Sequence, residues 1–201
     1  MDTLPVVAVL AGGRSSRMGA DKALLTVGGV CVLERVATAA LEVSARVMVV
    51  GRERPAAWPE RLDVTFVRDE EAEGAMAERS AGPLVGLITA LRQAGGPMLL
   101  LACDLPLVTS GLLRVLIASH RAENLATLAA TPEGPEPLCA IYTPGLLPTL
   151  EGMLRENRRA LRALVRAPGV ATFPVPVEYE RELLNVNTPA DLAEAERRLR
   201  G

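Results

Sequence analysis

Buried-strand runs and helical segments alternate along the first half of the chain, and this alternation restricts the possible folds most. Apolar runs without polar alternation, typical of strands buried on both faces, cover residues 6–10, 46–50, 64–67 and 98–103. Between the first two runs, the spacing of one helix face is shared by Leu33, Val36, Ala37, Ala40 and Leu41. The pattern predicts an α/β fold, a three-layer α/β/α domain with a mostly parallel, Rossmann-like sheet.

The second half of the sequence continues this alternation less regularly. Helix starts are marked by proline in a first turn, by a hydroxyl cap and by a capping box. These signals and the apolar periodicity predict helices that begin at Pro83, after Thr109 or Ser110, and at Thr188, and a further helix near 145–167. Strands are expected at 125–130, 138–142 and 171–177. No linker or repeat divides the sequence, so residues 1–201 are expected to form a single domain.

The overall charge argues against several classes of partner. The formal net charge is -2, and the chain has two Phe, two Tyr and one Trp. Neither a basic nucleic-acid or membrane surface nor an aromatic platform for single-stranded nucleic acid is therefore expected. A site for a phosphorylated ligand must be built from a few cations placed locally.

Cysteine and histidine usage favours a reducing compartment and argues against a zinc site. Cys31, Cys103 and Cys139 lie far apart without a CxxC pair, and His120 is the one histidine of the sequence. The apolar run before Ala11 is too short for a signal peptide or a membrane span. A cytoplasmic location is expected.

A glycine-rich basic loop, "LAGGRSSRMGADKALL", follows the first apolar run. Its glycines do not fit GxGxxG, and Lys22 lacks a following Ser or Thr, so neither a dinucleotide fingerprint nor a Walker A loop matches. Gly12 and Gly13 permit close approach of a ligand to the backbone. The cations that would suit a triphosphate are Arg14, Arg17 and Lys22. A glycine-rich turn with solvated basic residues is the alternative interpretation.

This loop resembles the signature LAGGxSxRMGxDKxLL of the nucleotidyltransferases similar to MobA, a molybdenum cofactor guanylyltransferase. Further motifs similar to those of the family follow in the same order: "GPLVGL" at 82–87, "CDLPLV" at 103–108, "PLCAIY" at 137–142 and "NVNTPADL" at 185–192. The resemblance spans nearly the whole chain. It implies a nucleotidyltransferase sheet whose N-terminal half binds the nucleotide and whose C-terminal half binds the acceptor.

The resemblance also assigns residues to the nucleotide site. Those it implies are Leu10, Ala11, Gly12, Gly13, Lys22, Asp69, Gly82, Pro83 and Asp104. Arg17 and Lys22 would contact the phosphates. Glu70 and Glu71 lie beside Asp69 and could take its place, and Gly-Pro at 82–83 is also a plain helix-start signal.

The reaction implied by the resemblance is transfer of GMP from GTP to the terminal phosphate of molybdopterin, giving molybdopterin guanine dinucleotide and pyrophosphate. Because the acceptor phosphate is already a nucleophile, the chemistry needs cations rather than a base. The expected catalytic residues are Arg17, Lys22 and Asp104. Asp104 is the expected ligand of Mg²⁺, which takes one or two carboxylates plus phosphate oxygens. An aspartate that bonds the backbone of its own turn is the alternative for Asp104.

Two segments are candidates for binding the acceptor. Asn185 and Asn187 alternate with Val186 and would share one face of extended chain, while turn and cap chemistry is their alternative role. Arg158 and Arg159 belong to a basic stripe of the helix expected near 145–167 and could attract the acceptor phosphate; a solvated helix face is the alternative. Molybdenum-cofactor delivery proteins or molybdoenzymes are the expected partners beyond the two substrates.

Other functions are compatible with parts of the sequence. A cytidylyltransferase or a sugar-phosphate nucleotidyltransferase would keep Arg17, Lys22 and Asp104 and change the base or the acceptor. A non-catalytic nucleotide-binding regulator need not retain a metal carboxylate, and a dinucleotide-dependent dehydrogenase fails on glycine spacing. Guanine selection follows from the resemblance alone.

Overall fold

A sheet of seven strands runs through the computed structural model, which describes residues 6–12, 21–68 and 82–200. In order across the sheet, the strands are β5 (Thr65–Val67), β4 (Val47–Val50), β1 (Val6–Leu10), β6 (Met98–Ala102), β8 (Gly134–Tyr142), β7 (Ala126–Thr131) and β9 (Val170–Pro174). The pairs β5–β4, β4–β1, β1–β6 and β7–β9 are parallel, whereas β8 is antiparallel to β6 and β7. The prediction of a mostly parallel sheet is confirmed.

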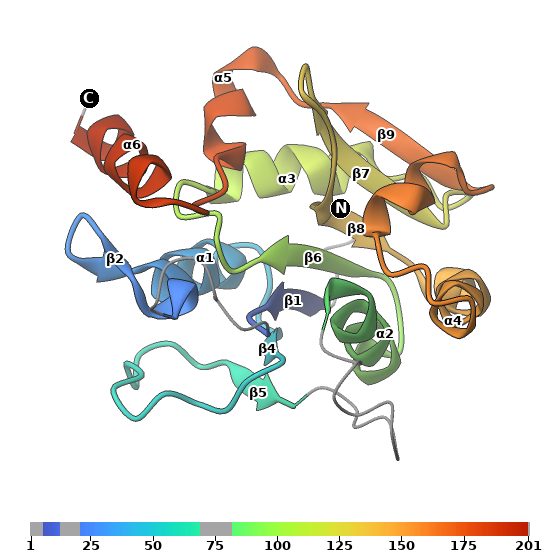
Figure 1. Cartoon of the computed structure of the whole chain (residues 1–201), viewed down its shortest axis with the longest axis horizontal. Coiled ribbons are helices and arrows are strands. Elements are labelled where there is room, and N and C mark those ends of the chain that lie inside the picture. Colours follow the sequence, from blue (N-terminus) through green and yellow to red (C-terminus); the bar gives the residue numbers. More distant parts are fainter. Residues whose placement is uncertain (1–5, 13–20, 69–81, 201) are drawn as a thin grey trace.

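Helices cover both faces of this sheet (Figure 1). One face carries α1 (Val32–Leu41) and α3 (Ser110–Ser119), and the other carries α2 (Pro83–Ala94) and α4 (Leu147–Arg155). Because side chains of a strand alternate between faces, Val9 of β1 packs with α1 and α3, while Ala8 packs with α2 and α4. The expected three-layer α/β/α architecture is therefore confirmed.

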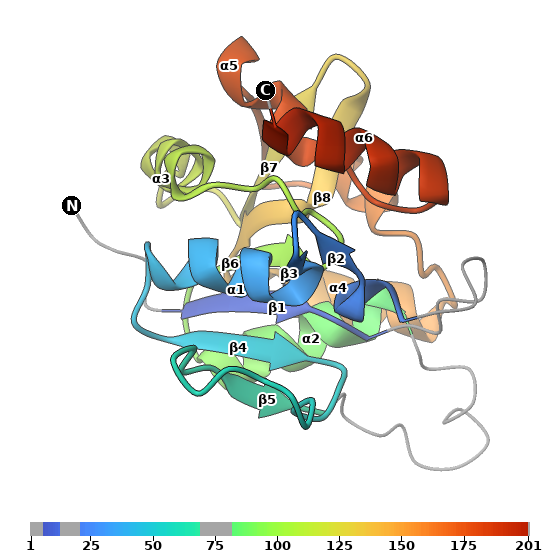
Figure 2. The same cartoon turned by 90° about the vertical axis from the view of Figure 1, so that its left-hand side faces the viewer.

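The remaining elements are short, apart from the C-terminal helix. They are η1 (Lys22–Leu24), β2 (Thr26–Val27), β3 (Val30–Cys31), η3 (Pro144–Leu146), η4 (Leu161–Arg166), α5 (Val177–Glu180), η5 (Arg181–Leu183) and α6 (Pro189–Arg200). The β2–β3 hairpin and α6 lie close together (Figure 2) and share a small apolar cluster with Val186, which is 1% exposed. Among the helices that the structure describes, none has both the length and the apolar character needed to cross a membrane.

The long helix expected near 145–167 is wrong. α4 ends at Arg155, Asn157 adopts a φ of 56°, and a separate 3₁₀ helix, η4, begins at Leu161. The sequence from 155 to 159, "RENRR", offers no apolar residue that could extend the buried face of α4, so the helix stops there. As a result, Arg158 and Arg159 lie in a turn and not on a helical stripe.

The strand expected at 171–177 is shorter than predicted. β9 ends at Pro174, and α5 begins at Val177. Pro174 and Pro176 lack the backbone N–H that a continuing strand would need, which accounts for the early end.

Candidate active site

Segments that are far apart in the sequence meet at the carboxyl ends of β1 and β6. The backbone N–H of Val186 donates to the Asp104 carbonyl at 2.9 Å, which places "NVN" directly beside "CDLP". The Lys22 Nζ donates to the Asn187 Oδ1 at 2.7 Å, which joins the basic loop to the same place. Ligands of parallel α/β sheets bind at this edge, so the three motifs build one candidate site.

Asp104 supplies a buried carboxylate to this site. Its Oδ1 is buried and has no hydrogen-bond partner among the residues that the structure describes. Burial raises the pKa of Asp104, while the positive charge of Lys22 opposes this rise. A buried carboxylate oxygen without a partner beside a cation is suited to ligate a metal or to face a ligand's polar groups.

This donor set fits Mg²⁺ better than a metal held by protein ligands alone. The described part of the chain contains no group of three or more His, Cys, Asp and Glu residues that could hold a metal ion. Mg²⁺ binds through one or two carboxylates together with substrate phosphates and several waters. The Asp104 carboxylate is therefore compatible with such a site.

Lys22 is placed by the short turn on which it lies. η1 follows directly on Asp21, whose Oδ1 accepts a hydrogen bond from the Ala23 N at 3.1 Å. The Ala23 side chain is 1% exposed and anchors the turn in the core of the α1 face. The chain is thus fixed on both sides of Lys22, and its ammonium points to Asn187.

The backbone of Asn187 is held by a capping box at the start of α6. Asp191 Oδ2 accepts hydrogen bonds from the backbone N–H groups of Asn187 and Thr188 at 2.9 and 2.8 Å, and these bonds lower the pKa of Asp191. The Thr188 hydroxyl accepts in return from the Asp191 N at 3.2 Å. The cap uses the backbone of Asn187 and leaves its side chain to contact Lys22, so the cap is compatible with the predicted site role.

Asn185 faces a group that the sequence did not single out. Its side chain hydrogen-bonds the Glu136 carboxyl of β8, and its Nδ2 donates to the Leu183 carbonyl at 3.4 Å. Burial raises the pKa of Glu136, the charge of Arg162 opposes the rise, and Asp104 adds to it. Asn185 thus connects the Asp104 region to Glu136, which stands immediately before the "PLCAIY" motif.

The thiol next to Asp104 is not a nucleophile. Burial, with a further contribution from Asp104, raises the pKa of Cys103 to about 12. The protonated thiol is unreactive at neutral pH. The backbone N–H of Cys103 donates to the Leu10 carbonyl at 3.0 Å and so joins β1 to the Asp104 segment.

The structure describes some of the other predicted nucleotide-binding residues and not the rest. Leu10 ends β1, with Ala11 and Gly12 just beyond it. Gly82 is the N-cap of α2 and Pro83 its first residue, so the helix-start prediction is confirmed. Outside the described residues lie Gly13, Arg14, Arg17, Asp69, Glu70 and Glu71.

The predicted acceptor-binding arginines have local partners. Arg158 Nε pairs with Glu156 Oε2 at 2.7 Å, and Arg159 Nε donates to Asn157 Oδ1 at 2.9 Å. Because these partners stand two positions away in the same turn, the contacts order the turn but do not place either guanidinium at Asp104. Their role in acceptor binding stays a prediction.

Asp21 and Arg52 are the residues that sequence reasoning missed on the nucleotide side. Arg52 Nη2 pairs with Asp21 Oδ2 at 3.0 Å, directly before the Lys22 turn. Arg52 stands just after β4, at the sheet edge where ligands are expected. The position of Arg52, a charged residue two positions after a buried strand, was the sequence signal that could have indicated a site residue.

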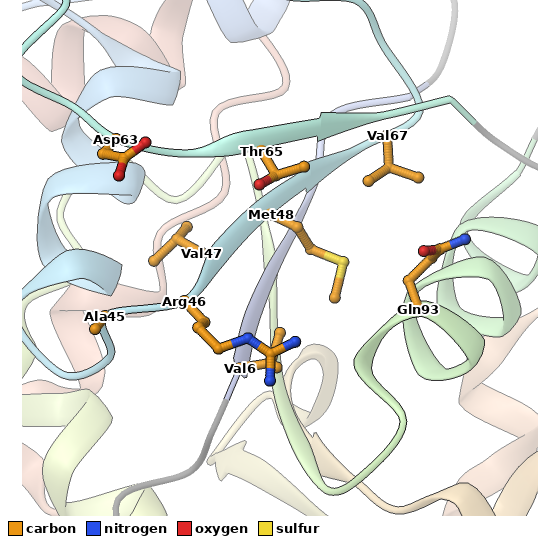
Figure 3. Close-up of a pocket in the computed structure, with 9 residues that line it drawn as sticks. All are labelled: Val6, Ala45, Arg46, Val47, Met48, Asp63, Thr65, Val67 and Gln93. Carbon is orange, nitrogen blue, oxygen red and sulfur yellow. The ribbon is translucent and has the colours of Figure 1, made fainter.

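A pocket of about 260 Å³ lies elsewhere (Figure 3). Its lining comes from β1, β4, β5 and the end of α2, with Arg46 and Asp63 as its charged residues. It contains none of the predicted site residues, and Val6 and Val47 open their strands at the amino-terminal edge. This pocket is therefore not the candidate active site.

Comparisons with known proteins agree with the geometry. Residues 7–172 match the model of the MobA-like NTP transferase domain. A protein of Nostoc sp. named "Probable molybdenum cofactor guanylyltransferase" is 37% identical over 194 residues, covering 92% of this chain and 87% of that protein. A protein of the same name from Deinococcus radiodurans is 35% identical over 196 residues, covering 95% of this chain and 94% of its own.

Solved structures give the same fold. Molybdopterin-guanine dinucleotide biosynthesis protein A from Archaeoglobus fulgidus superposes with a TM-score of 0.78 at 26% identity, covering 97% of this chain and 98% of that one. The 2-C-methyl-D-erythritol 4-phosphate cytidylyltransferase of Thermus thermophilus superposes with a TM-score of 0.66 at 24% identity, covering 98% of this chain and 100% of that one. The second likeness is one of fold alone.

Proposed function

The chain belongs to the MobA-like NTP transferase family, and we propose that it transfers GMP from GTP to the terminal phosphate of molybdopterin. The products are molybdopterin guanine dinucleotide and pyrophosphate. Relatives at 34 to 37% identity over more than nine-tenths of the chain, all named for this activity, support the assignment. The observation that carries the mechanism is the meeting of Lys22, Asp104 and Asn187 at the carboxyl edge of the sheet.

The nucleotide half of the site binds and neutralises the triphosphate. The Lys22 ammonium, whose charge acts on Asp104, would bind phosphate oxygens, and Arg17 of the same loop is assigned a matching role. Asp104 would hold Mg²⁺, which when bound offsets the charge that develops on the α-phosphate and on the leaving pyrophosphate. No side chain has to remove a proton from the acceptor phosphate, which agrees with the unreactive thiol of Cys103.

The acceptor half is assigned to the C-terminal part of the chain. Asn187 contacts Lys22 and Asn185 contacts Glu136, so the "NVN" segment lies between the nucleotide side and β8. Side-chain amides in this position would orient the acceptor phosphate toward the α-phosphate. Arg158 and Arg159 are assigned to attraction of the acceptor before it docks.

Two wider assignments accompany this function. The free thiols of Cys31, Cys103 and Cys139 support a cytoplasmic location, where thiols stay reduced. The expected recipients of the product are molybdoenzymes or proteins that deliver the cofactor to them.

Ligand-induced stabilisation tests the base preference. Melting curves are recorded with GTP, CTP, ATP and UTP, each with Mg²⁺, because a ligand that binds the folded state adds roughly 2.7 kcal/mol at a hundredfold excess over its dissociation constant. GTP is expected to raise the melting temperature most. A larger shift with CTP would reject the guanylyl assignment and favour a cytidylyltransferase.

A further inference from the structure

An ion pair between a largely buried arginine and a half-exposed aspartate adjoins the turn that carries Lys22. Arg52 Nη2 contacts Asp21 Oδ2 at 3.0 Å, and the other oxygen of Asp21 accepts from the Ala23 N. The carboxylate of Asp21 thus joins the end of β4 to the first residues of η1. Through this carboxylate, the guanidinium of Arg52 restrains the turn on both sides of Lys22.

The burial of Arg52 is unusual for an arginine of this chain. Its side chain is 15% exposed, whereas the ion-paired side chains of Arg61 and Arg68 are 67% and 72% exposed. Its Nε and Nη1 are buried and lack a hydrogen-bond partner among the described residues. Burial of two guanidinium nitrogens that have no partner in the described part of the chain is costly, so we expect Arg52 to have a role beyond packing.

The backbone around Arg52 fixes where the guanidinium enters the site. Gly51 adopts a φ of 93°, which a residue with a side chain rarely adopts, and its N–H donates to the Val67 carbonyl at 2.9 Å. The positive charge of Arg52 partly opposes the rise that burial causes in the pKa of Cys103, so the guanidinium is near the residue that precedes Asp104. Arg52 therefore lies near both the Lys22 turn and the segment that carries Asp104.

We propose that Arg52 is a positioning residue for Lys22, whose ammonium it aims at the triphosphate through its ion pair with Asp21. This inference rests on the proposed function, since it assumes that Lys22 binds nucleotide phosphate. Arg52 acts through Asp21 and the η1 turn, and Lys22 makes the contact with the ligand. Loss of the pair would leave Asp21 without its charged partner, and the turn would be held by the Asp21 cap bond and by its own backbone hydrogen bonds.

A double-mutant cycle between Arg52 and Lys22 tests this role. Arg52→Met keeps the apolar stem and removes the charge, and it is combined with Lys22→Ala. Dissociation constants for GTP and kcat/KM are measured for both single variants and the double variant. Arg52→Met alone is expected to lower kcat/KM about 10-fold or more, because small misplacements of a catalytic group have effects of this order.

In the Lys22→Ala background the same change is expected to add no loss beyond about 2-fold, the usual error of additivity. Arg52→Lys retains one charged contact to Asp21 and is expected to recover most of the activity. Asp21→Asn retains the cap acceptor, removes the charge and is expected to reproduce the loss. Arg61→Met, at an exposed ion pair, is the matched control and is expected to change neither constant.

Equal losses from Arg52→Met with and without Lys22 would overturn the inference, and so would wild-type affinity in Asp21→Asn. If the proposed function is wrong, the outcome differs from the outcome expected when only the role of Arg52 is wrong. If the wild-type protein prefers another nucleoside triphosphate, the cycle is run with that nucleotide, because Lys22 contacts phosphate and not the base. The base preference and the role of Arg52 are thus tested separately.

Discussion

The ammonium of Lys22 donates a hydrogen bond of 2.7 Å to the side-chain oxygen of Asn187, across 165 positions of the sequence. One partner belongs to the basic loop after β1, and the other precedes α6. The contact closes the nucleotide side of the site against the acceptor side. Removal of either partner of this contact is therefore expected to affect the ligand bound on the other side.

Replacement of Asn187 by alanine tests this closure. Asn187→Ala removes the partner that orients Lys22, and a hydrogen bond to a charged group contributes about 1.5–3 kcal/mol, so GTP affinity is expected to fall roughly 10-fold. Asn185→Ala is the matched control, because its contacts are with Glu136 and Leu183. Calorimetric titration with GTP should show the loss in the first variant only; equal losses would contradict a specific role for the Lys22 contact.

Asp104→Asn tests the metal ligand. The amide is nearly isosteric but a poor ligand for Mg²⁺, so metal-dependent transfer is expected to fall by at least about 10²-fold. Burial raises the pKa of Asp104, so the fold disfavours its ionised form, and the melting temperature is expected to stay equal or rise. The exposed Asp63→Asn serves as control. Retained Mg²⁺-dependent turnover in Asp104→Asn would move the metal site elsewhere.

The turn arginines are tested through the acceptor. Arg158→Ala with Arg159→Ala is expected to raise the Michaelis constant for molybdopterin several-fold and to leave that for GTP unchanged. The effect should shrink at high salt, because exposed charges are screened beyond a Debye length of about 8 Å at physiological ionic strength. Arg155→Ala, at the end of α4, is the control. Unchanged acceptor kinetics in the double variant would remove these residues from the acceptor site.

The stability of the fold should depend on pH through His120. Burial lowers the pKa of His120 from its usual 6.5, and its Nδ1 lies 2.9 Å from the Thr127 hydroxyl oxygen. The unfolded chain therefore takes up a proton at higher pH than the folded protein does, and the free energy of unfolding should fall as pH drops through 6.5. Urea unfolding from about pH 7.5 to about pH 5.5 measures this fall. The His120→Asn variant should show a flatter profile, and an unchanged slope would assign the effect to other groups.

Much of the fold could be predicted from the sequence because its strands are buried on both faces. Runs such as 6–10 and 98–103 contain apolar residues only or nearly so, and they form β1 and β6 as expected. Prediction failed where local signals conflicted, as at 155–159, where periodic arginines suggested a helix but no apolar residue could bury it. The two-residue strands β2 and β3 were missed because so short a segment has no periodicity.

The site was predictable where a motif follows a strand or caps a helix. Asp104 and Asn187 were predicted as site residues because they follow a recognisable strand end and precede a recognisable helix start, and because the family resemblance includes both motifs. Arg52 and Glu136 were missed because their roles depend on which elements lie side by side. The pairing of Arg52 with Asp21 joins two loops, and no pattern in either loop indicates the other.

The central claim is tested most directly by the product formed from each nucleotide. The purified protein is incubated with molybdopterin, Mg²⁺ and either GTP or CTP, and dinucleotide and pyrophosphate are quantified by mass spectrometry and a coupled assay. Molybdopterin guanine dinucleotide and pyrophosphate are expected in equal amounts from GTP, with little product from CTP and with transfer slowed at least about 10²-fold when Asp104→Asn replaces the wild type. Faster formation of the cytosine dinucleotide, or no dinucleotide from GTP, would contradict the assignment.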